Sequence, residues 1–271
     1  MHYEMKEGEV RGGGVIWTCS RTDPGVRDRN EDASGTFTLP HREGALYLLA
    51  VADGLGGHPA GEVASAIAIS ALRSAVSSTV EALEGMDVSS LQAILATGFS
   101  HANREVIRYA ATTPCCLGMG TTLVAALMNG EGAGVVGNVG DSRAYLFGEG
   151  TVRITRDHSR VQEMVDQGLI SQEQAGNHPL RHIVTRIIGR TDDIPDFFPF
   201  RLKDDLLVLC SDGLVDGVSE GELQSLAGRH GSPDICERLV EYARGRSRDN
   251  ITIVAAGRRR GLAFHGDCIL A

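Results

Sequence analysis

The sequence predicts an α+β fold in which helices cover a layered β-structure, and three observations lead to this prediction. Short runs rich in Val, Ile, Leu and Thr recur along the chain and are broken by Gly, Asn and Asp, as strands and their turns are. Two long amphipathic patterns follow one another in the first half of the chain. A run of strand-like segments comes next, and this order differs from a regular βαβ repeat.

The positions of the expected elements follow from residue type and period. Strands are expected where short apolar runs are bounded by turn residues, at 45–52, 121–127, 134–139, 143–147, 151–154, 206–210 and 251–256. Helices are expected where apolar residues recur every three or four positions, at 61–77, 89–110, 219–226 and 234–243.

The chain has 271 residues, which is enough for one domain with a large core. Neither an internal repeat nor a low-complexity linker divides it, so we predict a single domain over residues 1–271. Its core is expected over about 16–257, with short tails at both ends. A polar, mostly helical segment over about 157–189 has helices too short to carry a core, so we expect it to form a flap on the main body. We call it the flap segment.

Charge and hydropathy narrow the class of protein. The net charge of −9 opposes binding to a phosphate backbone, so no nucleic-acid partner is expected. The basic run 258–260 is expected to be a solvated tail. No window approaches eighteen consecutive apolar residues, and residues 1–14 lack the apolar stretch of a signal peptide, so no membrane insertion is expected.

The six cysteines form no Cys-x-x-Cys pair, and two of them are adjacent. This pattern predicts neither a disulfide framework nor a zinc site. It favours a reducing, cytoplasmic setting. No cysteine is followed by arginine six positions later, so the loop of the thiol phosphatases is absent.

Carboxylates stand beside several of the apolar strands. Asp53, Asp141 and Asp212 follow such strands, Asp249 precedes one, and Glu31 lies in a polar motif near the N-terminus. A buried carboxylate is costly unless it is paired or bound to a cation. A single acid of this kind is usually a turn residue or a helix cap. Four of them would form an oxygen-rich pocket if the strands are neighbours, and Mg²⁺ and Mn²⁺ prefer such ligands.

Eight sequence motifs, spread from about residue 22 to residue 256, carry the interpretation further. They read TDPGVRDRNEDA, VADGLGGHPAGEVAS, GMGTTLVAA, GNVGDSRAYLF, ITRDHSRVQEMVDQGLI, HPLRHIVTRIIG, DDLLVLCSDGLVDGVS and SRDNITIVAA. In content and order they resemble the metal-dependent protein phosphatases of type 2C, in their bacterial form. The resemblance implies a four-layer α-β-β-α sandwich of two antiparallel sheets flanked by helix pairs.

The resemblance also implies a metal centre with two tightly bound Mn²⁺ or Mg²⁺ ions. Asp53 would bridge both ions, and Glu31 and the backbone carbonyl of Gly54 would hold one of them. Asp212 and Asp249 would hold the other. The ligands are matched motif by motif and are all oxygens, as these ions require.

Further residues match positions around this centre. Asp32 and Asn250 would orient waters and ligands, and Arg27 would hold the substrate phosphate. Asp141, together with Asp212, would hold a weaker third ion. Each assignment has an alternative: Asp141 as a turn residue, Asp32 as a structural hydrogen-bond acceptor, and Arg27 as the partner of Asp28 or another surface acid.

The implied reaction is hydrolysis of phosphoserine and phosphothreonine monoesters in proteins, by direct attack of a metal-bridging water or hydroxide. Arg27, Asp53 and Asp212 would be its catalytic residues. Phosphorylated proteins and a cognate bacterial serine/threonine kinase are the implied partners, and a monomer is expected. Two alternatives stay open: a non-catalytic regulatory module on the same fold, and a phosphatase for small molecules.

Some positions depart from the family pattern or carry a simpler interpretation. Leu55 stands where animal relatives have a histidine thought to protonate the leaving group, and His182 stands where asparagine is common. His58 is expected to be a surface residue without a role. Thr121 and Thr122 are expected to pack in a strand, and Cys210 is expected in the core; these are expectations from position alone.

Overall fold

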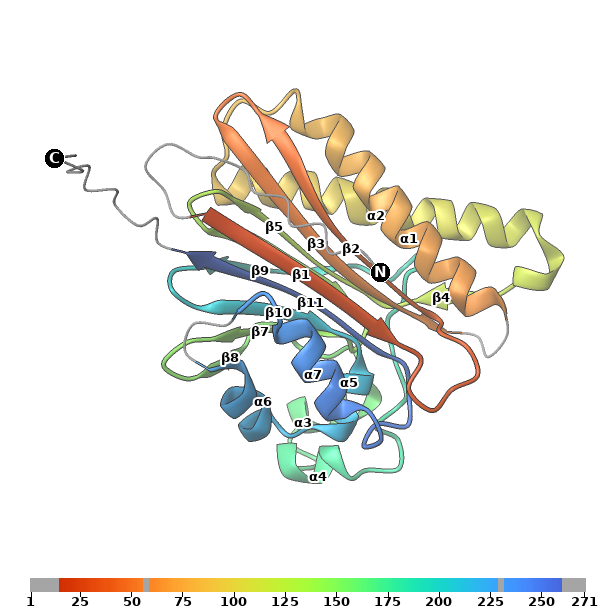
Figure 1. Ribbon diagram of the computed structural model, residues 1–271. Helices are drawn as coiled ribbons and strands as arrows, with labels where there is room; N and C mark the ends of the chain where they lie inside the picture. The colour runs from red at the N-terminus through yellow and green to blue at the C-terminus, as the bar shows by residue number, and fades with distance from the viewer. Residues whose placement is uncertain (1–14, 56–58, 229–231, 260–271) are drawn as a thin grey trace, which may run out of the picture.

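Two antiparallel β-sheets pack face to face, and helices cover the outer face of each (Figure 1). The computed structural model describes residues 15–55, 59–228 and 232–259. The architecture is the four-layer α-β-β-α sandwich that the resemblance implied. His58 and Arg260 lie outside the described residues, so the expectations about them stay untested.

Each sheet of the described chain has its own strand order. The β3 sheet runs β2-β3-β5-β6-β9, and the short β4 pairs with the end of β3. Its strands are β2 (Asp32–His41), β3 (Gly44–Leu55), β4 (Gly120–Thr121), β5 (Leu123–Asn129), β6 (Ala133–Val139) and β9 (Asp196–Arg201). The β11 sheet runs β1-β11-β10-β7-β8. Its strands are β1 (Val15–Asp23), β7 (Arg143–Phe147), β8 (Thr151–Arg153), β10 (Leu206–Cys210) and β11 (Ile251–Arg259).

The helices divide between the two sheets. The long α1 and α2 cover the β3 sheet, and α5, α6 and α7 lie over the β11 sheet (Figure 1). The helices are α1 (Pro59–Val80), α2 (Val88–Thr112), the 3-10 helix η1 (Pro114–Cys116), α3 (Arg160–Asp166), α4 (Gln172–Gly176), α5 (Asp212–Gly217), α6 (Glu220–Ala227) and α7 (Ile235–Ala243). Asp87 caps α2, since its carboxylate accepts hydrogen bonds from the amides of Ser89 and Ser90.

Strand β3 is buried on both faces, because alternate side chains point toward the helices and toward the other sheet. Leu46 and Leu48 pack against α1 and α2, while Tyr47, Leu49 and Val51 pack between the sheets. All five side chains are buried. A strand buried on both faces is a continuous apolar run, and this is why the sequence predicted it.

Helix α1 has an apolar composition that serves the core. Its segment Ala60–Val80 is long and apolar enough to span a membrane by length and composition alone. Ala64, Ala68 and Leu72 are fully buried in the cluster that joins α1 to the β3 sheet. The apolar character of α1 therefore has an explanation within the fold.

Three strands missed by the sequence analysis share a position. Strands β1, β2 and β9 each lie at an edge of a sheet, where polar and half-buried residues alternate irregularly. The short helix α5 begins at Asp212, directly after β10. The basic run was also misjudged, because Arg258 belongs to β11, pairs with Ile16 of β1 and donates to the carbonyl of Glu131.

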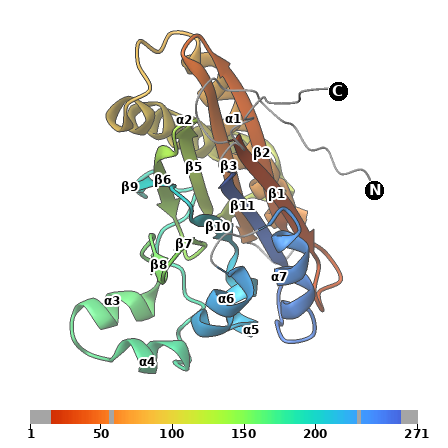
Figure 2. The same cartoon turned by 60° about the vertical axis from the view of Figure 1, so that its left-hand side comes forward.

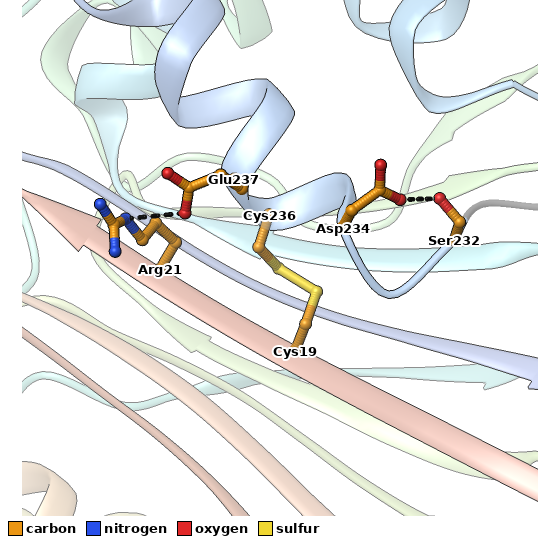
Figure 3. Close-up of a disulfide and its surroundings, with 6 residues drawn as sticks. All are labelled: Cys19, Arg21, Ser232, Asp234, Cys236 and Glu237. Carbon is orange, nitrogen blue, oxygen red and sulfur yellow. Dashed lines mark hydrogen bonds and ion pairs between the residues drawn. A yellow bond between two sulfur atoms is a disulfide. The ribbon is translucent and has the colours of Figure 1, made fainter. Parts of the chain in front are cut away.

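The expectation that the cysteines form no disulfide is wrong. Cys19 of β1 is bonded to Cys236 of α7, with the two Cα atoms 6.2 Å apart (Figure 3). The two residues are separated by 217 positions in the sequence, so only the contact between an edge strand and a distant helix brings them together. The thiols of Cys115, Cys116 and Cys210 are free, and Cys210 is buried in the core as expected.

The flap segment contains α3 and α4, which lie apart from the two sheets at one end of the molecule (Figure 2). Its far end returns to the β3 sheet at Ile188. There the amide of Thr121 donates to the carbonyl of Ile188 (3.0 Å), and the amide of Ile188 donates to the carbonyl of Thr121 (2.8 Å). A second bridge joins Ser159 to Val184 within the segment.

Phe99 joins the outer helices to the β3 sheet, so its removal should destabilise the fold. Its side chain is 1% exposed and meets Phe197 of β9 edge to face at a centroid distance of 5.9 Å. Phe99→Ala should lower the free energy of unfolding by about 3–5 kcal/mol, because it leaves a cavity between layers. Chemical denaturation measures the change.

Leu117→Ala is the matched control, since this side chain is 81% exposed. Its effect should stay within about 0.5 kcal/mol. Similar losses in the two variants would contradict the assignment of Phe99 to the core.

Candidate functional site

Five acids from distant parts of the sequence converge at one edge of the sandwich. Asp32, at the start of β2, pairs in register with Asp53 near the end of β3. Asp141 follows β6, Asp212 follows β10 and Asp249 precedes β11. The carboxylate of Asp53 interacts electrostatically with all four others. The structure thus unites the acids that the sequence analysis selected.

Threonine hydroxyls hold the backbone of Asp53. Its amide donates to Oγ1 of Thr122 (2.9 Å), and its carbonyl accepts from Oγ1 of Thr121 and from the amide of Thr122, each at 2.8 Å. The hydroxyls of Thr122 and Ser142 are 2.7 Å apart, which links Asp53 to the turn that carries Asp141. These threonines were expected only to pack in a strand, and their polar role was missed.

Two glycines bring oxygens of Glu31 and Gly54 together. The amide of Gly54 donates to the carbonyl of Glu31 (3.2 Å). A Cβ atom on Gly61, in the first turn of α1, would lie 2.5 Å from Oε2 of Glu31 and 3.0 Å from the carbonyl oxygen of Gly54. A side chain at position 61 would crowd both oxygens, which therefore lie close to one another beside Gly61.

The amide side chain of Asn250 holds the loop between β1 and β2. Its Oδ1 accepts from the amide of Glu31 (2.8 Å), and its Nδ2 donates to the carbonyls of Pro24 (2.9 Å) and Arg29 (2.8 Å). One side chain thus sets the positions of Glu31 and of the loop that contains Arg27.

Arg27 is paired with an acid of the site. Its Nη2 donates to Oδ2 of Asp249 (2.8 Å), and its Nε donates to the carbonyl of Arg248 (2.9 Å). Its side chain is 57% exposed, so the guanidinium is open to a ligand from solution. Of the alternative pairings, the one with Asp28 is wrong, and a pairing with another acid is what the structure shows, since the partner is the partly exposed Asp249.

Ser211 is a residue of the site that the sequence analysis missed. Its hydroxyl donates to Oδ2 of Asp32 (2.8 Å) and accepts from the amide of Thr252 (3.0 Å). The signal for it was weak, because a serine before Asp212 is also an ordinary helix cap.

The electrostatics of this edge fit bound cations. Burial raises the pKa of Asp32 to about 7 and that of Asp212 to about 6, and neighbouring carboxylates add to the rise. Burial and the same neighbours raise the pKa of Asp53 and of Asp141. Oδ1 of Asp32 and Oδ1 of Asp212 are buried without a hydrogen-bond partner among the described residues. Unsatisfied carboxylate oxygens that repel one another suit Mn²⁺ or Mg²⁺.

A cavity of about 290 Å³ adjoins the acids. Asp141 and Asp212 line it on one side, and Arg181 and His182 of the flap segment line it on another. Ligand atoms of His182, Asp212 and Asp216 lie within 4.8 Å of one another. Neither His182 nor Asp216 was selected as a ligand from sequence, because nothing in their spacing sets them apart.

Comparison with known proteins identifies the family of the chain. A family model described as protein phosphatase 2C matches residues 26–252. The serine/threonine phosphatase stp of Listeria innocua is 40% identical over 211 residues, which cover 76% of this chain and 81% of the relative.

Solved structures agree in fold. The crystal structure of serine/threonine phosphatase Stp1 from Staphylococcus aureus has a TM-score of 0.79 at 34% identity, with 96% of this chain and 100% of that chain covered. The catalytic domain of the serine/threonine phosphatase PstP, solved in complex with two manganese ions, has a TM-score of 0.76 at 34% identity, with 90% and 99% covered. The matched range contains every acid of the site, and this chain belongs to the protein phosphatase 2C family.

Proposed function

We propose that this chain is a metal-dependent phosphatase that hydrolyses phosphoserine and phosphothreonine monoesters in proteins. The observation that carries the proposal is the convergence of five carboxylates at one sheet edge, two of them with buried oxygens that no described residue satisfies. PstP, a relative of the same fold, is named a serine/threonine protein phosphatase and was solved with two manganese ions.

Two Mn²⁺ or Mg²⁺ ions are assigned to these oxygens. Asp53 would hold both ions, Glu31 and the carbonyl of Gly54 would hold one, and Asp212 and Asp249 would hold the other. When bound, such a pair supplies an acidified water and positive charge at the phosphoryl group. The position of Oε2 of Glu31 and the carbonyl oxygen of Gly54, both beside Gly61, supports the assignment of these two ligands to one ion. Electrostatic contact between the carboxylates of Asp212 and Asp249 supports the second.

Arg27 binds the phosphoryl group of the substrate. Its guanidinium presents a planar pair of N–H donors that matches two phosphoryl oxygens. In the described chain the partner is Asp249, whose carboxylate has two possible tasks: it pairs with Arg27 or it ligates a metal. Asp249 would hold a metal ion, and Arg27, which is 57% exposed beside it, would remain open to the phosphoryl group.

The remaining residues position the site. Asp32, held by Ser211, and Asn250, held by three backbone groups, are proposed to orient waters and ligands around the ions. Asp141 is proposed to hold, with Asp212, a third and weaker ion. Leu55 lies at the end of β3 opposite Gly120 and offers no proton donor, so the leaving group takes its proton from water.

The alternatives have specific weaknesses. A non-catalytic module on this fold would lack metal ligands, and no expected ligand is missing from this chain. A small-molecule phosphatase would use the same metals, so only the substrate distinguishes it. The proposal also includes a cognate serine/threonine kinase, a monomeric state, a cytoplasmic location and a role for residues 157–189 as a flap. The bond between Cys19 and Cys236 removes the cysteine argument for a reducing compartment.

Metal ions should be required for turnover. Mn²⁺ should support phosphate release from a phosphothreonine peptide, and chelation should abolish it. Asp53→Asn should lose metal and activity together, because one carboxylate serves both ions. Asp28→Asn, an exposed acid of the neighbouring loop, should retain both. Colorimetric phosphate assays and calorimetric Mn²⁺ titrations give the two readouts, and full activity in excess chelator would falsify the scheme.

Arg27→Ala should separate substrate binding from metal binding. The lost charge-assisted hydrogen bonds, each worth about 1.5–3 kcal/mol, should reduce kcat/KM roughly tenfold or more. Mn²⁺ affinity should be equal or tighter, because Asp249 no longer pairs with the guanidinium. Arg29→Ala, from the same exposed loop, is the matched control. An unchanged kcat/KM in Arg27→Ala would remove this residue from substrate binding.

The metal-free protein should lose stability as the pH rises. Asp32 and Asp212 hold protons in the folded state up to about pH 7 and about pH 6, whereas in the unfolded chain they ionise near pH 4. Between these values the folded state binds more protons, so the free energy of unfolding falls as pH rises. Saturating Mn²⁺, which binds the ionised carboxylates, should weaken or reverse the trend.

Thermal unfolding in chelator and in Mn²⁺, from about pH 5 to about pH 8, measures this dependence. A melting temperature of the chelated protein that climbs across the range would show that these carboxyls are ionised when folded.

A further inference from the structure

Strand β1 is linked at three successive points on one side to helix α7 and to Arg244, the residue that follows the helix. Positions 19, 21 and 23 alternate with their neighbours, so their side chains lie on the same face of β1. Figure 3 shows the first two links. The three pairs are the disulfide Cys19–Cys236, the ion pair Arg21–Glu237 at 3.1 Å and the ion pair Asp23–Arg244. We call them the β1–α7 clamp.

Both clamped elements lead directly into the proposed catalytic corner. Strand β1 ends at Asp23, and the next residues form the loop that carries Arg27. Helix α7 ends at Ala243, and the following loop carries Asp249. The Asp23–Arg244 pair of the clamp lies at the base of both loops, whereas the disulfide joins the first turn of α7 to β1 four residues before Asp23.

The two loops touch one another at several atoms. Arg27 donates to Asp249 and to the carbonyl of Arg248. A Cβ atom on Gly25, which has a φ of +60°, would collide with the carbonyl oxygen of Asp249. The two loops are in tight contact at Gly25 and Asp249. A shift of α7 along β1 would therefore move Asp249 relative to Arg27.

The disulfide is the strongest of the three links. The Arg21–Glu237 side chains are about a third exposed, so this ion pair contributes little. The other ion pair joins the half-exposed Arg244 to the buried Asp23 and is not covalent. Ile235, Leu239 and Val240 anchor α7 by burial in the core. Reduction of the bond would therefore leave the helix docked but less strictly aligned.

We propose that the Cys19–Cys236 pair is a thiol–disulfide switch that tunes the corner formed by Arg27 and Asp249. Oxidation forms one S–S bond and removes two electrons and two protons from the two thiols. A small disulfide of the glutathione type accepts them and becomes two thiols. Cys19 is half buried, within reach of a small thiolate. The inference rests on the proposed roles of Arg27 and Asp249.

The test compares the full chain in oxidising and reducing glutathione buffers, with the bond quantified by thiol titration. Reduction should raise KM for a phosphothreonine peptide and the Kd for Mn²⁺ by roughly fivefold, the low end of coupling between separate sites. The kcat at saturating Mn²⁺ should change less than KM. Hydrogen exchange at residues 24–30 should become faster.

Variants assign the effect to this bond. Cys19→Ser should behave like the reduced protein in both buffers, and a melting curve verifies that it folds. Cys115→Ser, which removes an exposed thiol outside the clamp, should respond to the buffers as wild type does.

Two results overturn the switch: equal KM and equal Mn²⁺ affinity in the two buffers, or a redox response that persists in Cys19→Ser. If wild type shows no Mn²⁺-dependent turnover in either buffer, the proposed function fails. Hydrogen exchange and Mn²⁺ affinity, compared between the two buffers, then test the clamp without an activity assay. If both are the same in the two buffers, the switch is rejected as well.

Discussion

Mutual repulsion among buried carboxylates is the constraint on which the rest of this structure depends. Asp53 lies among four other acids where the two sheets meet, and burial raises the pKa of several of them. Such a cluster is unfavourable by itself, so the surrounding core must supply the stability that it removes. The apolar layer between the sheets, which includes Leu49 and Leu209, meets that need. The same repulsion between carboxylates would favour a bound cation, which relieves it.

Neutral polar groups hold these acids in place before any ion binds. Thr122 grips the backbone of Asp53, Ser211 orients Asp32 and Asn250 holds the loop of Glu31. None of these groups carries a charge, so they fix geometry while Oδ1 of Asp32 and Oδ1 of Asp212 stay without a partner among the described residues. A site of this design binds ions into ligands that are already oriented, which reduces the ordering needed at the moment of binding.

The sequence predicted central strands and long helices well, because strands such as β3 and β10 are buried on both faces and read as continuous apolar runs. It missed the edge strands β1, β2 and β9, whose half-exposed residues follow no clear period, although it predicted the edge strand β8. The acids of the site were predictable from their motifs. The contacts that orient them were not, because the register of Asp32 opposite Asp53 and the reach of Asn250 across 219 positions depend on tertiary structure. The Cys19–Cys236 bond was hidden for the same reason.

The return of the flap segment to the β3 sheet has a consequence for protein engineering. Ile188 exchanges two backbone hydrogen bonds with Thr121, and the hydroxyl of Thr121 holds the carbonyl of Asp53. The flap segment and the backbone of Asp53 are therefore not structurally independent. A chimera that receives this segment from a relative also receives a new neighbour for Thr121. Its grafted boundary has to reproduce the backbone pairing at Ile188 before differences in specificity become interpretable.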